Sequence, residues 1–311
     1  MRAMKLAVIF GTLFLLAACS PAQPASTATA AATITPVPPT LTKIATPSIT
    51  VTSTPAFTAT ITPTATADKR PLPRAWGSWP IIPTASARAI AIYQKGLALG
   101  LTPHTYSVVG DCQSAPEVFM GIYGTDRNPV KADRPDLLET ISLFHDSFNH
   151  DSAAVRDGLS APSALDPFWA DPKRCNATES PVACELRLYK PSIVFVNLGT
   201  NWKAGASADA YEGYLRKIVG LIIENGSVPI LTNKADNVEG DHSLNLATAK
   251  VAYDYDIPMM NFWLASDPLP NHGLDPARNN VYLTPEGWDV RNNVALRTLD
   301  SIWRSLQAGN P

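Results

Sequence analysis

Residues 105–116, which read TYSVVGDCQSAP, constrain the fold more than any other stretch of this 311-residue chain. The β-prone residues 106–109 stop at Gly110-Asp111, and Cys112 follows at the turn before a helical segment. An α/β hydrolytic fold presents its attacking atom in this way, at the carboxyl edge of a parallel sheet. The stretch therefore predicts such a sheet, with Cys112 either as a nucleophile or as a small, buried and inert side chain.

Strand-like and helix-like segments alternate along the globular part of the chain. An apolar run over residues 192–198 is typical of a strand that is buried on both faces of a parallel sheet. An amphipathic segment over residues 211–226 and another strand at residues 228–231 follow it. Because helices between parallel strands form right-handed crossovers, we expect an α/β fold, a three-layer α/β/α sandwich with a parallel sheet.

The first residues carry a targeting pattern. Arg2 and Lys5 precede an apolar run that ends in small residues directly before Cys19. This pattern resembles the lipobox of bacterial lipoproteins, which implies cleavage before Cys19 and a lipid on that residue. We therefore expect residues 1–18 to be a lipoprotein signal peptide and the protein to be extracytoplasmic, anchored to a bacterial membrane through Cys19. An ordinary secretory signal is the alternative.

Residues 19–72 consist almost wholly of Ala, Thr, Pro and Ser, and Lys43 is the one charge between Cys19 and Asp68. Such a composition cannot bury enough apolar area to offset its ordering entropy. We expect this segment to be a disordered stalk, and residues 73–311 to form the globular domain.

Two further cysteines, Cys175 and Cys184, lie nine positions apart in a polar segment. In an oxidising compartment this spacing favours a local disulfide. A metal site is the alternative, but no histidine or second cysteine pair stands at ligand spacing. We expect the disulfide, and neither a metal nor another cofactor.

Three blocks stand in a fixed order at strand ends or helix starts: Gly110-Asp111-Cys112, Gly199-Thr200-Asn201, and residues 279–287, which read NNVYLTPEG. Together they resemble the blocks of the SGNH (GDSL-like) hydrolase family, over roughly the whole of residues 73–303. The resemblance implies a flavodoxin-like fold and ester hydrolysis by a Ser-His-Asp triad, with an oxyanion hole built from an asparagine and backbone N–H groups.

The resemblance places Cys112 at the nucleophile position, Asn279 at the acid position and Tyr282 at the base position, so all three triad positions are altered. A triad needs an imidazole that accepts a proton near pH 7 and a carboxylate that orients it. A phenol and a neutral amide do neither. Ordinary Ser-His-Asp hydrolysis is therefore not expected.

The oxyanion-hole positions are better matched. Asn201 takes the position of the family's oxyanion asparagine, and either Gly158 or Ala161 supplies the backbone donor. A turn-capping amide is the alternative interpretation of Asn201.

Two histidines on loops are candidates for a substitute base. His272 lies ten residues before Tyr282 in the same loop, and His242 lies on a loop after another strand. A thiol needs less help than a hydroxyl, since a few per cent is already thiolate at neutral pH. Surface-loop histidines without a catalytic role are the alternative.

Four tryptophans in or near the predicted loops, Trp169, Trp202, Trp263 and Trp288, offer flat faces that suit sugar rings, or belong to the core. The sequence thus favours a surface lipoprotein that binds or acts on glycans or acylated surface molecules. The alternative is an active esterase or acyltransferase with Cys112 as nucleophile and His272 as base. A net charge of −2 gives no indication of a nucleic-acid partner, and we expect a monomer.

Overall fold

The computed structural model describes residues 68, 70–130, 132–203 and 205–308. The predicted signal peptide, Cys19 and the predicted stalk up to residue 67 lie outside these residues. Among the helices that are described, none is both long and apolar enough to span a membrane.

A parallel sheet forms the centre of the described domain. Its strands are hydrogen-bonded in chain order: β1 (Thr102–Gly110), β2 (Pro191–Asn197), β3 (Val228–Thr232) and β4 (Met259–Met260). Six of the seven residues of β2 are buried, as its apolar run predicted.

The open edge of β1 carries the remnant of a further strand. Val155 forms an isolated parallel bridge to Gly110, on the side of β1 that faces away from β2. Ala154 O accepts from Gly110 N at 3.0 Å, and Arg156 N donates to Gly110 O at 3.1 Å. When the segment at Val155 is counted as a strand, the second strand of the chain lies outside the first. This spatial order is that of a flavodoxin-like sheet.

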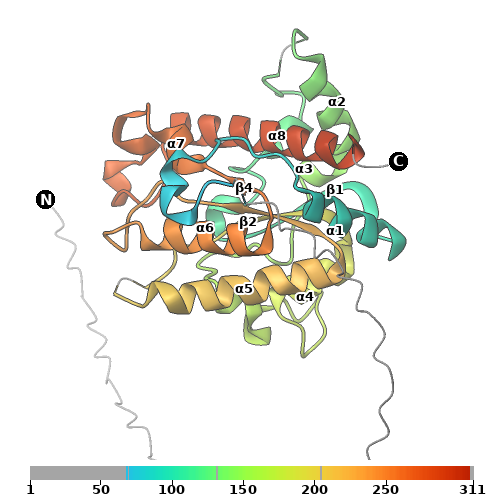
Figure 1. Ribbon diagram of the computed structural model, residues 1–311, viewed down its shortest axis with the longest axis horizontal. Helices are drawn as coiled ribbons and strands as arrows, with labels where there is room; N and C mark the ends of the chain where they lie inside the picture. Colours follow the sequence, from blue (N-terminus) through green and yellow to red (C-terminus); the bar gives the residue numbers. More distant parts are fainter. Residues whose placement is uncertain (1–67, 69, 131, 204, 309–311) are drawn as a thin grey trace, which may run out of the picture. The chain divides into compact units, whose positions relative to one another are not determined.

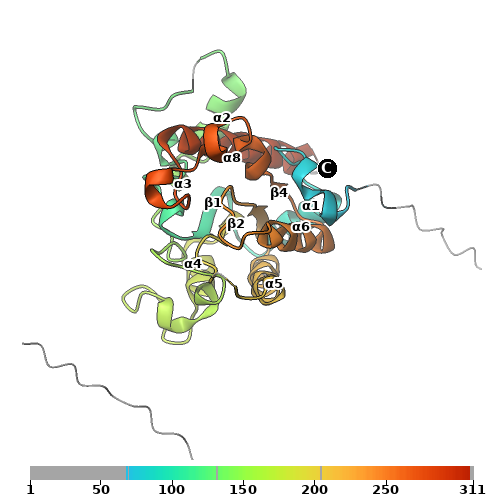
Figure 2. The same cartoon turned by 90° about the vertical axis from the view of Figure 1, so that its left-hand side faces the viewer.

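Helices cover both faces of the sheet. The helices α4 (Pro181–Tyr189), α5 (Ala208–Asn225) and α6 (Ser243–Tyr255) lie on one side, and α8 (Pro285–Ala308) lies on the other (Figure 1). The view turned by 90° shows the same three layers, with α4 and α5 opposite α8 (Figure 2). The α/β/α sandwich predicted from the sequence is confirmed.

Shorter elements complete the described domain. Three helices contact α8: α1 (Ala87–Ala98), α2 (Pro135–Leu143) and α7 (Phe262–Ser266). The one-turn α3 (His145–Phe148) contacts β1. The 3-10 helices are Pro73–Ser78, Cys112–Ser114, Gly121–Gly124, Ser163–Leu165, Pro167–Trp169, Pro270–Gly273 and Pro276–Arg278.

Local signals set the limits of the helices, as α5 illustrates. Ser207 caps its first turn by accepting from the N–H groups of Asp209 and Ala210. Gly226 ends the helix with φ +90°, and a Cβ atom at this position would lie 2.5 Å from Gly96 Cα. Glycine is therefore required there for both the backbone conformation and the close approach to α1.

Contacts of the domain begin a few residues before the predicted boundary at residue 73. Arg70 Nη1 lies 2.8 Å from Asp256 Oδ1, and its guanidinium lies 4.2 Å from the ring centroid of Tyr253. These contacts attach the start of the described chain to the C-terminal end of α6.

Candidate active site

The turn after β1 presents Cys112 at the carboxyl edge of the sheet. Asp111 Oδ1 accepts from Gln113 N at 2.9 Å and thereby caps the 3-10 helix Cys112–Ser114. A Cβ atom on Gly110 would lie 2.1 Å from Ser114 Oγ, so only glycine allows this tight return of the chain. The Cys112 side chain is left half-buried, and it is the one free thiol among the described residues.

The partners of the Cys112 thiol are Asp157 and Tyr282. Burial raises the pKa of Cys112 above its ordinary value, and the charges of Asp111 and Asp157 raise it further, as does the hydrogen bond that the thiol donates to Asp157. The Tyr282 hydroxyl donates to the sulfur and acts in the opposite direction. The thiol is therefore held mainly protonated at neutral pH, which is the reverse of the activation that a cysteine nucleophile needs.

Tyr282 is held in place from both sides of its backbone. The Gln113 side chain donates to Val281 O at 3.1 Å and accepts from Leu283 N at 3.3 Å. The Arg278 guanidinium lies 3.6 Å from the centroid of the Tyr282 ring, within the range of a cation–π contact. The nearby sulfur raises the pKa of Tyr282, so this phenol cannot serve as a base near neutral pH.

Asn201 lies in the same region, but its amide is already engaged. Its Nδ2 donates to Asp111 Oδ2 at 2.9 Å and to Leu159 O at 3.4 Å. Burial raises the pKa of Asp111 to about 6, an effect that the nearby Arg291 opposes. An oxyanion at this position would have to displace one of these internal acceptors.

The two candidate backbone donors differ in position. Gly158 has φ +74° and lies between Asp157, which contacts Cys112, and Leu159, which contacts Asn201. Its left-handed conformation thus directs two neighbours into the site. Ala161 is 1% exposed and belongs to the hydrophobic core.

The structure does not bring Asn279 or the candidate histidines to the thiol. Asn279 is exposed, in a left-handed conformation at the end of the helix Pro276–Arg278. The His272 ring stacks on Trp263, with centroids 5.4 Å apart, and the His242 ring lies 5.8 Å from the same indole. The expected pairing of Cys112 with His272 is thus not found in the described part of the chain, because the left-handed turn at His272 packs the imidazole against Trp263.

The remaining predicted tryptophans have different neighbours. Trp202 packs edge-on against Tyr211, with centroids 5.5 Å apart, and Trp288 packs against the core from α8. Trp169 is half-buried beside the guanidinium of Arg156, whose carbon lies 5.9 Å from the ring centroid.

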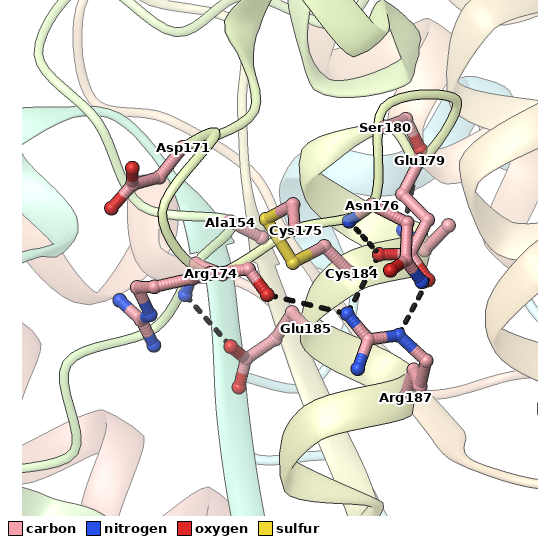
Figure 3. The surroundings of a disulfide bond; sticks show 12 residues. Ala154, Asp171, Arg174, Cys175, Asn176, Glu179, Ser180, Cys184, Glu185 and Arg187 are labelled. Carbon is pink, nitrogen blue, oxygen red and sulfur yellow. Dashed lines mark hydrogen bonds and ion pairs between the residues drawn. A yellow bond between two sulfur atoms is a disulfide. The ribbon is translucent and has the colours of Figure 1, made fainter.

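A disulfide joins Cys175 to Cys184 on α4 (Figure 3). Beside it, Arg187 Nη2 donates to Glu179 Oε2 at 2.8 Å and to Arg174 O at 3.3 Å. The loop before α4 is thus attached to the helix by one covalent and several polar contacts. Within the described ranges, no group of three or more His, Cys, Asp or Glu side chains is arranged to hold a metal ion.

A hollow of about 440 Å³ opens beside Cys112. Its lining is mostly polar and includes no histidine of the described residues. The residues that line it are Cys112, Ala115, Pro116, Glu117, Asn149, Asp151, Ser152, Val155, Arg156 and Asp157. The arrangement can hold a polar ligand next to the thiol, but it offers no imidazole to activate the sulfur.

Sequence reasoning identified the positions of Cys112, Asn201 and Tyr282 but missed the residues that contact them. Asp157 and Gln113 were not singled out, although each directly adjoins a residue or block that was. The one signal in the sequence for these two residues was their position, since Asp157 precedes Gly158 and Gln113 follows Cys112.

No family model matches the chain, and no curated protein matches it either. Several solved structures are similar to it. A GDSL-like lipase from Bacteroides thetaiotaomicron is 17% identical over 68% of this chain and 96% of that chain, with a TM-score of 0.42. A putative lipolytic protein of the G-D-S-L family from Desulfitobacterium hafniense is 15% identical over 63% of this chain and 99% of that chain, with a TM-score of 0.42. An acetylxylan esterase from Geobacillus stearothermophilus is 14% identical over 65% of this chain and 96% of that chain, with a TM-score of 0.42.

Proposed function

We propose that this chain is a lipid-anchored bacterial surface protein whose SGNH-like domain binds a glycan or an acylated surface molecule without hydrolysing it by the Ser-His-Asp route. The observation that carries the proposal is the setting of Cys112, whose thiol contacts Asp157 and Tyr282 where a triad would supply an imidazole. The membrane anchor is inferred from the sequence pattern that ends at Cys19.

The groups around the thiol support binding over turnover. A carboxylate such as Asp157 is ordinarily a much weaker base than a thiolate, so it does not withdraw the proton from Cys112. Tyr282 has a raised pKa and also retains its proton. The amide of Asn201 is occupied by Asp111 and Leu159 O. Nucleophile, base and oxyanion donor are therefore all compromised, while the hollow beside them persists.

Turnover of acyl esters tests this proposal. The full chain and its Cys112→Ala variant are incubated with short-chain acyl esters and acetylated sugars, and acid release is measured. We expect equal rates, at the level of the buffer. Hydrolysis by the parent that disappears in Cys112→Ala would overturn the proposal and establish the alternative, an esterase or acyltransferase with Cys112 as nucleophile.

A further inference from the structure

A second hollow shares part of its lining with the hollow beside Cys112. The second hollow, of about 310 Å³, includes Trp169, and both hollows are lined by Asp151, Ser152, Val155 and Arg156. The two hollows therefore lie next to each other, and together they are called here the groove from Cys112 to Trp169.

The floor of this groove is anchored to the sheet. It is formed by the segment that takes the place of the missing edge strand, where Val155 pairs with Gly110. Ser152 Oγ donates to Val108 O at 2.8 Å, and Ala153 N donates to the buried carboxylate of Glu185 at 2.7 Å. A floor bonded in this way needs little ordering when a ligand binds.

The far wall of the groove is attached to the floor by two arginines. Arg174 contacts Asp151 twice, with Nη1 at 3.0 Å from Oδ2 and Nη2 at 2.8 Å from the carbonyl oxygen. Arg156 Nη1 donates to Trp169 O at 2.8 Å. Figure 3 shows Asp171 and Arg174 on the loop that leads into the disulfide, so this wall is tied to α4 as well.

The chemistry of the lining indicates the ligand class. Four carboxylates face two guanidinium groups along the groove: Glu117, Asp151, Asp157 and Asp171 against Arg156 and Arg174. This excess of negative charge disfavours a polyanion. Short polar groups next to the flat indole of Trp169 suit the hydroxyl groups and the apolar face of a sugar ring.

We infer that the groove from Cys112 to Trp169 binds a linear oligosaccharide that is neutral or carries amino groups, with Trp169 as the stacking residue at the far end. This inference rests on the proposed binding function and specifies its ligand class and its second subsite.

Calorimetric titration of the full chain with three tetrasaccharides tests the inference: neutral tetra-N-acetylchitotetraose, its cationic deacetylated form, and anionic tetragalacturonate. We expect the first two to bind more tightly than the third. Trp169→Ala should weaken their binding roughly 5- to 10-fold, the range of one aromatic stacking contact, while Trp169→Phe should retain most of it. The matched control is Phe168→Ala, because this neighbouring side chain is 89% exposed and does not line the groove.

A second variant guards against misfolding of Trp169→Ala. Glu117 is exposed at the Cys112 end of the groove. Glu117→Lys should therefore weaken the binding of the cationic tetrasaccharide and leave the binding of the neutral one unchanged. Tighter binding of tetragalacturonate, no binding of any of the three ligands, or Trp169 and Glu117 variants that bind like the parent would each overturn the inference. Failure of the proposed function is detected separately, as ester turnover that depends on Cys112.

Discussion

The domain contains both a candidate nucleophile and a carboxylate–imidazole pair, but in two different regions. Beyond the carboxyl end of β1, Cys112 faces Asp157 and Tyr282. Alongside β1, the buried carboxylate of Glu185 lies 2.7 Å from His150 Nε2. The pair resembles the base and orienting acid of a hydrolase, yet the partners that the described residues give it are Ser107, Ala153 and Tyr189, and not Cys112. Chemistry therefore depends on which groups the topology brings together, and not on which groups the chain contains.

The carboxylate–imidazole pair has a structural role that the Cys112 region depends on. Glu185 also accepts from Ser107 Oγ at 2.6 Å and from Ala153 N at 2.7 Å. These bonds hold residues 150–153, and hence the segment that carries Asp157 to the thiol. The His150 ring is further fixed by stacking on Tyr189, with centroids 3.5 Å apart.

The largest expected effect comes from removing the buried carboxylate. Glu185→Ala leaves the side chains of His150 and Ser107 and the N–H of Ala153 without their acceptor, so we expect the free energy of unfolding to fall by about 3–5 kcal/mol. Urea titration measures this. The matched control is Glu139→Ala, which removes an exposed carboxylate that pairs with Arg304 and should have a much smaller effect. Similar losses in both variants would contradict the structural role of Glu185.

The next effect concerns Asp111, whose pKa burial raises to about 6. A raised pKa in the folded state means that the folded protein binds more protons than the unfolded one between about pH 4 and 6. Asp111 therefore contributes stability below that range, and the contribution is lost as pH rises through it. The free energy of unfolding should therefore fall between pH 3 and pH 7 by about 3 kcal/mol less in Asp111→Asn than in the parent. Urea unfolding at each pH measures this difference.

The control for this pH profile is Asp241→Asn. Hydrogen bonds from Ser243 lower the pKa of Asp241, so this carboxylate acts in the opposite direction, and its stabilising contribution is lost as pH falls. A parent profile that does not change with Asp111→Asn would show that the pKa of this carboxyl is not raised.

A smaller effect is expected on the reactivity of the thiol. Asp157→Asn removes a negative charge that raises the pKa of Cys112 and replaces the carboxylate acceptor with a neutral amide. We expect alkylation of Cys112 by iodoacetamide at pH 7.5 to become roughly 3- to 10-fold faster, because more of the sulfur is thiolate. The labelled peptide is quantified by mass spectrometry. Asp151→Asn, a change to a carboxylate that lines the same hollow but pairs with Arg174, should have a smaller effect on the rate.

The smallest effect belongs to Tyr282, which acts on the thiol in the opposite direction from Asp157. Tyr282→Phe keeps the ring beside Arg278 but removes the hydrogen bond that lowers the pKa of Cys112. The same alkylation assay should therefore become roughly 2- to 3-fold slower. A faster reaction would mean that the phenol shields the sulfur sterically and does not stabilise its thiolate.

Local sequence patterns were sufficient for the core of the fold. The apolar run of β2 and the turn from Gly110 to Cys112 were both predictable, because strand burial and turn geometry are written in neighbouring residues. The resemblance of the last block to the SGNH family's base position likewise placed Tyr282 near Cys112, 170 residues away.

Elements that depend on tertiary packing do not follow from local sequence patterns alone. The segment at residues 153–155 forms only one bridge to β1, because the Ser152 hydroxyl bonds to both Val108 O and Ala154 N, the groups that would extend the pairing. The helical segment from α2 to α3 is likewise interrupted at Phe144, which is fully buried and has φ −101° and ψ 17°. Side-chain burial outweighs local propensity at such positions.

The sequence by itself determined the α/β sandwich and the place of Cys112 on it, because periodic patterns and turn residues act over a few positions. Only the tertiary structure decided what surrounds the thiol. His272 was near enough in the chain to suggest a base, but its ring packs on Trp263, whereas Asp157 reaches Cys112 from the remnant strand. Electrostatic and hydrogen-bond partners depend on distances in the folded chain, and these follow from the packing of the whole domain.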